Sequence, residues 1–412
     1  MTAFLFSFAL FAANENDFLT KGEEALSKED YENAIFYLNK AMRAEPDRPE
    51  ISGYLGKAYN NLALKLFEGE ETEKAMQNME TALDIDPGNT VFRENAANIL
   101  YTIAVSKYKN RDFPASLINL DKALIYNATD LKSLLLKGEI SYYSQNMENA
   151  EESWRRALAI DPSSQAAKDR LAKLENEMPV ESNFKQIEGV NFDIRFDRND
   201  GTYDAYAIKD FLREAYRDIG RDLGYYPNHT IVVIAYSEES GKEALFGLPL
   251  WSEGVFDGKI RLPAVNKGEI DERRLKGILW HEYTHALIFD LTLGNCPAWL
   301  NEGIAVYEEA KYQQIDIKPL LDAYAENRLM GIRQLADSFS GIEDRDKAFL
   351  AYMQSYTMVE YFIERYGFWY LTRLLEALKE QDTIDEAMRE TVLITPDDFE
   401  KEWLKFVKEK SL

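Results

Sequence analysis

The pattern of small and apolar positions repeats from the amino-terminal part of the chain to Met178. Gly22, Ala34, Leu38, Ala41 and Pro46 recur at identical offsets as a second set, namely Gly138, Ala150, Trp154, Ala157 and Pro162. The alanine near the end of each unit recurs at positions 41, 82, 123 and 157, in two equal steps and a shorter third. This pattern predicts helical hairpins, each with an apolar stripe that the next hairpin must cover.

The unit resembles the tetratricopeptide repeat, a helical hairpin of about 34 residues with small side chains where its two helices touch and a proline after the second helix. The resemblance implies an all-α solenoid over residues 14–178, with four units and a polar-faced capping helix at Ser163–Met178. Seven extra residues in each longer unit, about two helical turns, lengthen a helix. A protein or peptide partner is expected on the repeats. A plain helical bundle is the alternative.

The pattern changes after Pro179, where strand signals come first and helices follow. An amphipathic helix is expected at Tyr206–Leu223, and almost everything after Asp271 is expected to be helical. The expected strands lie at Asn191–Phe196, at Thr230–Tyr236 and on both sides of the Asp257-Gly258 turn in Val255–Leu262. Strands followed by helices predict an α+β domain over residues 180–412, with a small sheet packed on helices.

Charge and cysteine content exclude several classes of protein. The formal net charge is −24 over 412 residues, and no Lys/Arg-rich run interrupts it, which opposes nucleic-acid binding. Cys296 is the single cysteine, so an intrachain disulfide or a Cys-only zinc site cannot form.

The amino-terminal apolar run, Ala3–Ala13, is too short for a stable membrane span, which needs about 20 residues. It fits a signal peptide over residues 1–13 and predicts a periplasmic or secreted protein. The alternative is an apolar first turn packed on the next helix, which would leave the protein cytoplasmic.

The chemistry is concentrated in the segment His281-Glu282-Tyr283-Thr284-His285. On a helix, residues four apart share a face, so both imidazoles can reach one metal ion. Glu282 lies about 100° further round the helix, where its carboxylate can reach a metal-coordinated water. This is the H-E-x-x-H pattern of zinc hydrolases, and it contains two of the three histidines in the chain. The alternative is a pair of ordinary buried histidines.

A catalytic zinc ion needs three protein ligands and an open position for water. The remaining histidine, His229, lies on the other side of the predicted strands, so Glu302, on the helix expected after that of His285, is the better third ligand. Three nearby acids are candidates for orienting an imidazole N–H, namely Asp290, Glu308 and Glu309.

The string Trp299-Leu300-Asn301-Glu302-Gly303, with Ala305, resembles the gluzincin metallopeptidases and in particular their zinc aminopeptidase branch. The resemblance implies one Zn²⁺ per chain on His281, His285 and Glu302, with Glu282 as general base. It also implies a tyrosine, at a fixed spacing before a glycine, that stabilises the oxyanion. Tyr352 and Gly367 keep this spacing, and Tyr356, one turn later, is the alternative.

The chain departs from the aminopeptidase pattern upstream of His281, where Ser252–Phe256 replaces the G-x-M-E-N motif that holds a free amine. Cleavage within a peptide chain is therefore favoured, with Gly254–Leu262 as a sheet edge that pairs with an extended substrate. The sequence thus predicts a zinc endopeptidase with a docking solenoid, and all its chemistry lies after Val180. A catalytically inert peptidase-like module, acting as a binding or assembly factor, is the alternative.

Overall fold

The computed structural model describes residues 17–197, 205–237, 254–262, 271–336, 339, 342 and 344–411. Contacts divide the chain into two compact units. Unit 1 comprises Met1–Tyr142 and Glu148–Leu171, and unit 2 comprises Tyr143–Met147 and Ala172–Leu412. The predicted signal peptide over residues 1–13 lies outside the described residues and stays a prediction.

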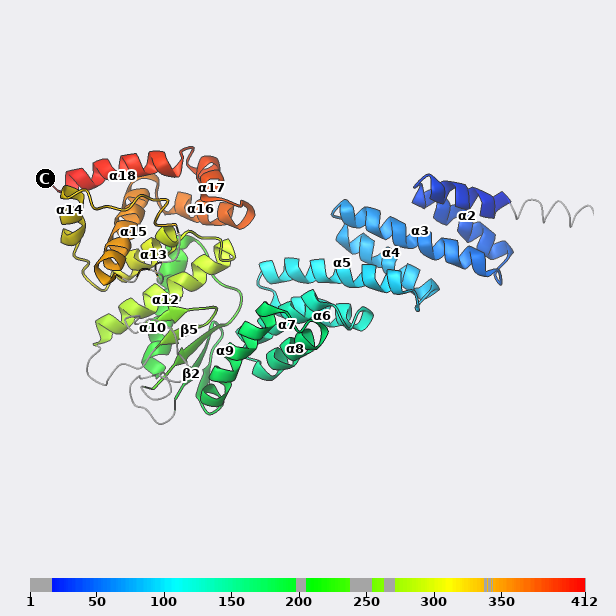
Figure 1. Ribbon diagram of the computed structural model, residues 1–412, viewed down its shortest axis with the longest axis horizontal. Helices are drawn as coiled ribbons and strands as arrows, with labels where there is room; N and C mark the ends of the chain where they lie inside the picture. Colours follow the sequence, from blue (N-terminus) through cyan, green and yellow to red (C-terminus); the bar gives the residue numbers. More distant parts are fainter. Residues whose placement is uncertain are drawn as a thin grey trace, which may run out of the picture. The chain divides into compact units, whose positions relative to one another are not determined.

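Unit 1 is built from consecutive helices joined by short turns (Figure 1). After a helix over residues 17–27, they are α2 (Tyr31–Ala44), α3 (Pro49–Glu68), α4 (Thr72–Ile85), α5 (Thr90–Lys109), α6 (Phe113–Tyr126), α7 (Leu131–Tyr143), α8 (Met147–Ile160) and, as far as Leu171, α9 (Gln165–Glu181). Several begin at a side-chain cap, as at Asp30, Asn89 and Asp112, whose oxygens accept backbone N–H groups of the first turn. The solenoid prediction is confirmed.

The backbone follows the same period as the sequence. Left-handed residues stand in the turn within each hairpin at Glu29, Glu70, Arg111 and Gln145, with φ between 58° and 62°. They are spaced as the repeated alanines are, with two equal steps and a shorter third. The helices α3 and α5 have 20 residues each, against 13 in α7, so the seven extra residues do lengthen a helix.

The repeated positions are the contact points between helices. The repeated small and apolar residues of α2, α4, α6 and α8 are all buried, namely Ala34, Leu38, Ala41, Ala75, Met79, Ala82, Ser116, Leu120, Ala123, Ala150, Trp154 and Ala157. A Cβ atom on Gly22 would lie 2.6 Å from Leu38 Cγ, and one on Gly138 would lie 2.2 Å from Trp154 Nε1. The repeated glycines are therefore required by close helix packing.

Unit 2 begins with a mixed sheet in the order β1-β2-β3-β5-β4. Its strands are β1 (Lys185–Glu188), β2 (Phe192–Phe196), β3 (Ile231–Ala235), β4 (Val255–Phe256) and β5 (Ile260–Leu262). The β2–β3 and β3–β5 pairs are parallel, and the outer pairs, β1–β2 and β4–β5, are antiparallel. The sequence analysis missed β1, a short and mostly exposed strand without an apolar alternation.

The two faces of this sheet are covered by different helices. Ile194, Val233 and Ile260 belong to the same buried cluster as residues of α10 (Ala205–Leu223) and α12 (Glu272–Thr292). The opposite face presents Val232, Ile234 and Tyr236, which pack against Val180 and Phe184 at the end of α9 and just beyond it. Pro179 lies inside α9, and the boundary between the units falls within that helix, after Leu171.

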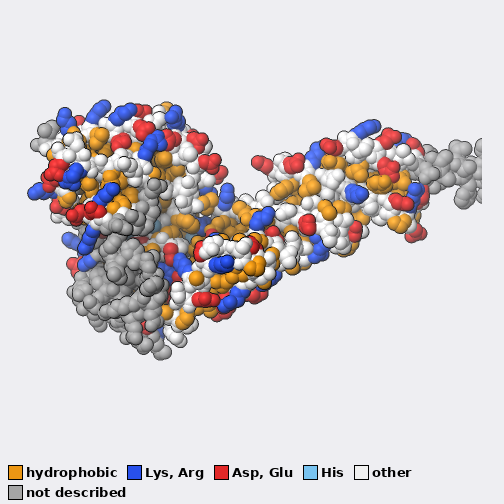
Figure 2. Space-filling model, viewed as in Figure 1, with side chains coloured by type: hydrophobic (Ala, Val, Ile, Leu, Met, Phe, Trp, Pro, Cys, Tyr) orange, Lys and Arg blue, Asp and Glu red, His pale blue; other side chains and the backbone are white. Residues whose placement is uncertain are grey.

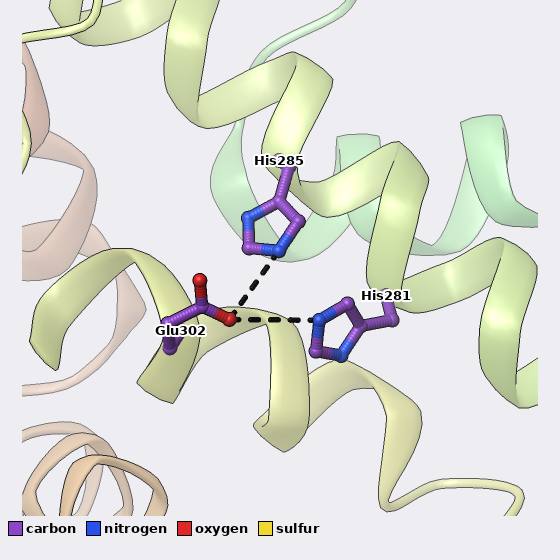
Figure 3. A group of neighbouring side chains, drawn as sticks. All are labelled: His281, His285 and Glu302. Carbon is purple, nitrogen blue, oxygen red and sulfur yellow. Dashed lines mark ion pairs between the residues drawn. The ribbon is translucent and has the colours of Figure 1, made fainter. Parts of the chain in front are cut away.

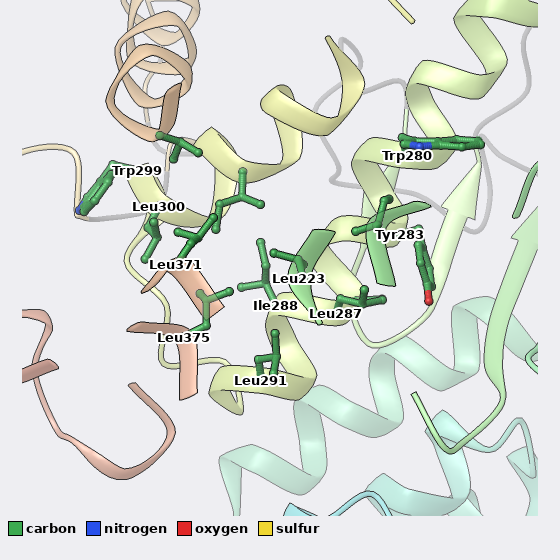
Figure 4. Packing of buried hydrophobic residues seen from close by; sticks show 14 of the residues in the cluster. Leu223, Trp280, Tyr283, Leu287, Ile288, Leu291, Trp299, Leu300, Leu371 and Leu375 are labelled. Carbon is green, nitrogen blue, oxygen red and sulfur yellow. The ribbon is translucent and has the colours of Figure 1, made fainter. Parts of the chain in front are cut away.

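Helices dominate the rest of unit 2, as predicted. They are α12, α13 (Ala298–Glu309), α14 (Lys318–Ala325), α15 (Arg345–Tyr366), α16 (Phe368–Glu380), α17 (Ile384–Thr391) and α18 (Pro396–Lys410). Figure 4 shows the centre of their core, where side chains of α12 meet Leu223 of α10, Leu300 of α13 and Leu371 of α16. The small sheet and its helices confirm the α+β prediction.

Charged side chains of both signs are interspersed among the described residues on the face drawn in Figure 2. None of the described helices combines the length and the apolar character that crossing a bilayer requires.

Candidate metal centre

The centre is built on α12, a helix buried on nearly every side. Asp271 caps its first turn by accepting the backbone N–H of Arg274 at 2.8 Å. Leu279, Trp280 and Tyr283 are fully buried beside His281, Glu282 and His285. Because these apolar residues anchor α12 in the core, the helix holds both imidazoles on one face, where their side chains are 17% and 11% exposed.

The next helix returns Glu302 to the two histidines (Figure 3). Glu302 Oε2 lies 3.6 Å from His281 Nε2 and 3.5 Å from His285 Nε2. The ligand atoms of these three residues all lie within 4.8 Å of one another. The structure therefore brings together the three residues that the sequence analysis selected as metal ligands.

The other nitrogen of each imidazole is already engaged. His281 Nδ1 lies 2.9 Å from Glu309 Oε2, and His285 Nδ1 lies 3.0 Å from Asn301 Oδ1. Both partners are acceptors, so each Nδ1 carries a proton and each Nε2 faces Glu302, where a bound metal ion would take its lone pair. Metal-binding histidines in proteins are commonly oriented in this way.

Close packing of α13 on α15 fixes the position of the helix that carries Glu302. A Cβ atom on Gly303 would lie 2.4 Å from the carbonyl oxygen of Ser355 in α15. At the start of α13, the N–H groups of Ala298 and Trp299 donate to the carbonyl oxygens of Ala336 and Leu335. The glycine after Glu302 is thus a packing requirement, and it brings α15 next to the centre.

Glu282 points towards the amino-terminal end of the edge strand. A Cβ atom on Gly254 would lie 2.5 Å from Glu282 Cγ and 2.6 Å from its Oε1, so the backbone at Gly254 packs directly on this carboxylate. Glu282 is buried, and its Oε2 has no hydrogen-bond partner among the described residues. A buried acceptor in this state can take a further hydrogen-bond donor.

Electrostatics separate the two carboxylates of the centre. Burial raises the pKa of Glu282, and the histidines only partly oppose this shift. Burial acts on Glu302 in the same direction, but the two imidazoles outweigh it and hold the pKa of Glu302 well below its usual value. Glu302 is therefore anionic and suited to bind a cation, whereas Glu282 is the carboxylate that more readily takes a proton.

The two candidate tyrosines on α15 have different surroundings. Burial raises the pKa of Tyr352, and the carboxylates that raise it further are Glu302, Glu282 and Glu309. Burial also raises the pKa of Tyr356, to about 12, but its acidic neighbours are Glu360 and Glu364, and its ring lies 6.4 Å from that of Tyr307. The acidic neighbours of Tyr352 are thus those of the centre, whereas those of Tyr356 are not.

Other residues singled out from the sequence lie elsewhere. His229 Nε2 lies 2.7 Å from Asp290 Oδ2, which also accepts from the Tyr225 hydroxyl at 3.2 Å. Glu308 is fully buried and pairs with Lys311. Of the three acids proposed to orient an imidazole, Glu309 is the one placed against a histidine of the centre.

Two contributors were missed by the sequence analysis. Asn301 was recognised as part of a motif but given no role, although its side chain orients His285. Gly254 was noted only within the predicted sheet edge, and its contact with Glu282 depends on folding. Position 301 could have been inferred, because it precedes the ligand Glu302 on the same helix.

The donor set fits a zinc ion. It comprises two imidazole Nε2 atoms and one anionic carboxylate, and the buried carboxylate of Glu282 lies outside it. Two histidines and one glutamate are a known ligand set of catalytic zinc, with a coordination position left for water. Cys296, whose thiol pKa is raised by burial and then by Glu302, stays a protonated and poor ligand.

Comparisons with known proteins agree with this division of the chain. Residues 221–409 match the family model of the Peptidase MA superfamily, and residues 18–48 and 56–89 match that of the tetratricopeptide repeat. Sperm-associated antigen 1 of Mus musculus is 24% identical over 158 residues, which cover 38% of this chain and 12% of that protein.

Solved structures of repeat proteins are similar to parts of the chain. A tetratricopeptide repeat protein from Parabacteroides merdae has 13% identity and a TM-score of 0.28, over 82% of this chain and 98% of that chain. The first tetratricopeptide domain of Spaghetti (RPAP3), bound to an HSP90 peptide, has 19% identity and a TM-score of 0.23, over 30% and 93%. The family models therefore match tetratricopeptide repeats in the amino-terminal part of the chain and the Peptidase MA superfamily in residues 221–409.

Proposed function

We propose that this protein is a zinc-dependent peptidase that hydrolyses bonds within peptide chains. The observation that carries the proposal is the convergence of His281 and His285 Nε2 on Glu302, with both Nδ1 atoms held by acceptors. A histidine pair that only packs a core needs no such convergence on a third, anionic ligand. The match to the Peptidase MA superfamily supports the same interpretation.

Zinc held by His281, His285 and Glu302 would lower the pKa of a water molecule and polarise the scissile carbonyl. Glu282 then accepts a proton from the attacking water and delivers it to the nitrogen of the leaving amine as the C–N bond breaks. Its raised pKa suits this shuttle, since the carboxylate must hold the proton between the two steps. Tyr352 donates its hydroxyl hydrogen bond to the oxyanion that develops on the carbonyl.

The edge strand β4 is our proposed binding surface for the substrate backbone. It is the outermost strand of the sheet, pairs with β5 alone among the described strands, and begins next to Glu282. An extended peptide that adds to this edge would bring a bond in its middle to the centre. This mode needs no pocket for a free amine, and the proposal is therefore an endopeptidase.

The repeats are proposed to bind protein substrates or partners and to raise their local concentration at unit 2. A periplasmic or secreted location remains a proposal that rests on the amino-terminal apolar run. The inert-module alternative predicts that the centre binds no metal, and metal analysis therefore distinguishes the two functions directly.

The decisive experiment compares the wild-type chain with Glu282→Gln and a control, Glu272→Gln. Glu272 lies on the same helix, but its side chain is 70% exposed. We expect about one zinc ion per chain in all three proteins. Hydrolysis of denatured protein substrates should fall by about 10²–10⁴-fold in Glu282→Gln alone.

Full activity in Glu282→Gln would contradict the mechanism. Absence of bound metal at saturating zinc would contradict the enzyme assignment and leave the inert module. Peptides released from a whole proteome by wild type but not by Glu282→Gln would then define the cleavage preference.

A further inference from the structure

A second buried polar cluster lies in unit 2, on the sheet face that is opposite α12. Its centre is Arg261 of β5, whose side chain is 1% exposed. The guanidinium donates to Glu177 Oε1 at 2.9 Å and to Glu181 Oε1 at 3.0 Å, both on α9, and to Asp257 Oδ2 at 2.9 Å in the turn before β5. One arginine therefore joins a helix and a hairpin through three carboxylates.

Further contacts close the cluster around Arg261. Tyr236, just after β3, accepts from Arg261 and donates to Glu181 Oε1 at 2.6 Å. Gln145 donates to the other oxygen of Glu181 at 2.8 Å, and Lys173 of α9 donates to Asp257 at 2.7 Å. Every carboxylate of the cluster thus has a cationic partner or a hydrogen-bond donor.

The charges of this cluster are strongly coupled. Burial tends to raise the pKa of Glu181 and Asp257, but the neighbouring cations hold both pKa values below the usual value. Lys259, which is fully buried beside them, has its pKa lowered by burial to about 7. Removing one partner from such a set leaves an uncompensated buried charge, so the remaining groups must move or admit water.

The hairpin held by Arg261 contains the edge strand. Val255 of β4 pairs with Arg261 of β5, and Asp257, which the guanidinium binds, belongs to the turn that joins the two strands. One residue before β4 is Gly254, whose backbone packs on Glu282. A continuous path of contacts therefore runs from the α9 carboxylates, through Arg261 and β4, to the Glu282 carboxylate.

We propose that Arg261 is a positioning residue, which fixes the edge strand on α9 and thereby holds Gly254 against Glu282. The part of this inference that concerns catalysis by Glu282 rests on the proposed function. In this arrangement Arg261 touches neither the substrate nor the metal ligands, and its effect passes through the backbone of residues 254–257. The short hairpin needs this anchor because β4 has two residues and pairs on one side only in the described sheet.

The test uses two variants of the full chain and one control. Arg261→Met removes the charge and keeps an apolar stem, and Glu177→Gln removes one carboxylate while it preserves the shape of the side chain. Val407→Ala is the control, because it removes buried volume from α18 and lowers stability without touching the hairpin. If Arg261→Met does not fold, Glu177→Gln carries the test.

Hydrogen–deuterium exchange measures positioning without any need for activity. We expect amides of residues 254–262 to exchange about tenfold faster in Arg261→Met and Glu177→Gln, and at the wild-type rate in Val407→Ala. Zinc content should stay near one ion per chain in all variants, since the ligands lie on α12 and α13. Unchanged exchange at 254–262 in both variants, or equally fast exchange in Val407→Ala, would overturn the proposal.

Kinetics then connect the strand to the reaction. With a peptide of about eight residues that can pair along β4, we expect KM to rise and kcat per bound zinc to fall, each by about fivefold or more. If Arg261 had a purely structural role, its loss would reduce the fraction of active protein and leave KM unchanged, as we expect for Val407→Ala. An unchanged KM in Arg261→Met would therefore reject the positioning role. If wild type cleaves nothing, the proposed function fails, and the exchange measurement still decides whether Arg261 holds the strand.

Discussion

Unit 2 contains two buried polar clusters that are built on opposite principles. Around Arg261, three carboxylates meet Arg261, Lys173 and Lys259, and the shared hydrogen bonds stay within the cluster. Around His281, the carboxylates of Glu282, Glu302 and Glu309 meet two imidazoles, and one oxygen of Glu282 lacks a partner among the described residues.

The difference in charge balance distinguishes a cluster that stabilises the fold from one that is suited to chemistry. A cluster with balanced charges does not need a bound ion, and removing one of its charged groups lowers the stability of the fold. In the other cluster the described carboxylates outnumber the imidazoles, an arrangement that a bound cation would balance. Burial alone would have marked both clusters as functional sites, and the balance of charge tells them apart.

The largest effect should follow from removing the part of the Arg261 cluster that precedes Val180. A chain that begins at Val180 lacks Lys173 and Glu177, as well as Gln145 and Met147, which belong to unit 2. We expect its free energy of unfolding to fall by about 3–5 kcal/mol, because Arg261 loses one of its carboxylates together with most of the helix that covers it. Urea denaturation of the truncated and full chains measures this loss of stability, with the unfolding of unit 2 followed by the fluorescence of its tryptophans.

This expectation replaces the simpler prediction that a domain starting at Val180 is self-sufficient because all catalytic groups follow it. Glu177→Gln in the full chain should reproduce part of the loss, whereas Glu175→Gln, on the exposed side of α9, should not. A truncated chain as stable as unit 2 in the full protein would show that the cluster is dispensable.

Removing the oxyanion donor should have the next largest effect. Tyr352→Phe should lower kcat by about 10²–10³-fold, or about 2.7–4 kcal/mol of transition-state stabilisation, while zinc stays bound. Tyr356→Phe is the matched control, because Tyr356 lies one turn away and faces Glu360 and Glu364. Equal losses in both variants would remove the distinction that the structure draws between them.

The smallest effect should come from the groups that orient the histidines. Glu309→Gln weakens the acceptor of His281 Nδ1 and should lower zinc affinity by about 10–100-fold. Glu326→Gln, an exposed residue paired with Arg328, is the control. Competition with a chelator of known affinity gives the zinc affinity of both variants. An unchanged affinity in Glu309→Gln would exclude this orienting role.

The proximity of His281, His285 and Glu302 could be predicted from the sequence because its geometry is local. His281 and His285 share a helix face by spacing alone, and Glu302 lies on the next helix, a short turn away. The repeats were also predictable, since each hairpin packs on its neighbour and the small residues must recur. In both cases the contacts join residues close together along the chain.

The Arg261 cluster could not be predicted in this way. Glu177 and Glu181 look like the polar face of a terminal helix, and Lys259 and Arg261 look like ordinary charges around a hairpin. Arg261 meets Glu177 across 84 residues and Glu181 across 80. A single sequence contains no pattern that pairs such distant charges, because their burial follows from the packing of α9 on the sheet.

During translation, α9 is synthesised well before the residue that its carboxylates bind. Glu177 leaves the ribosome 84 residues before Arg261, which at typical rates of translation amounts to about 4–17 s. During this interval the repeats can fold, since their contacts are local, whereas the last turns of α9 keep hydrated carboxylates and an uncovered apolar stripe. A nascent chain stalled between these positions should therefore present α9 to chaperones, and Arg261 should end that exposure.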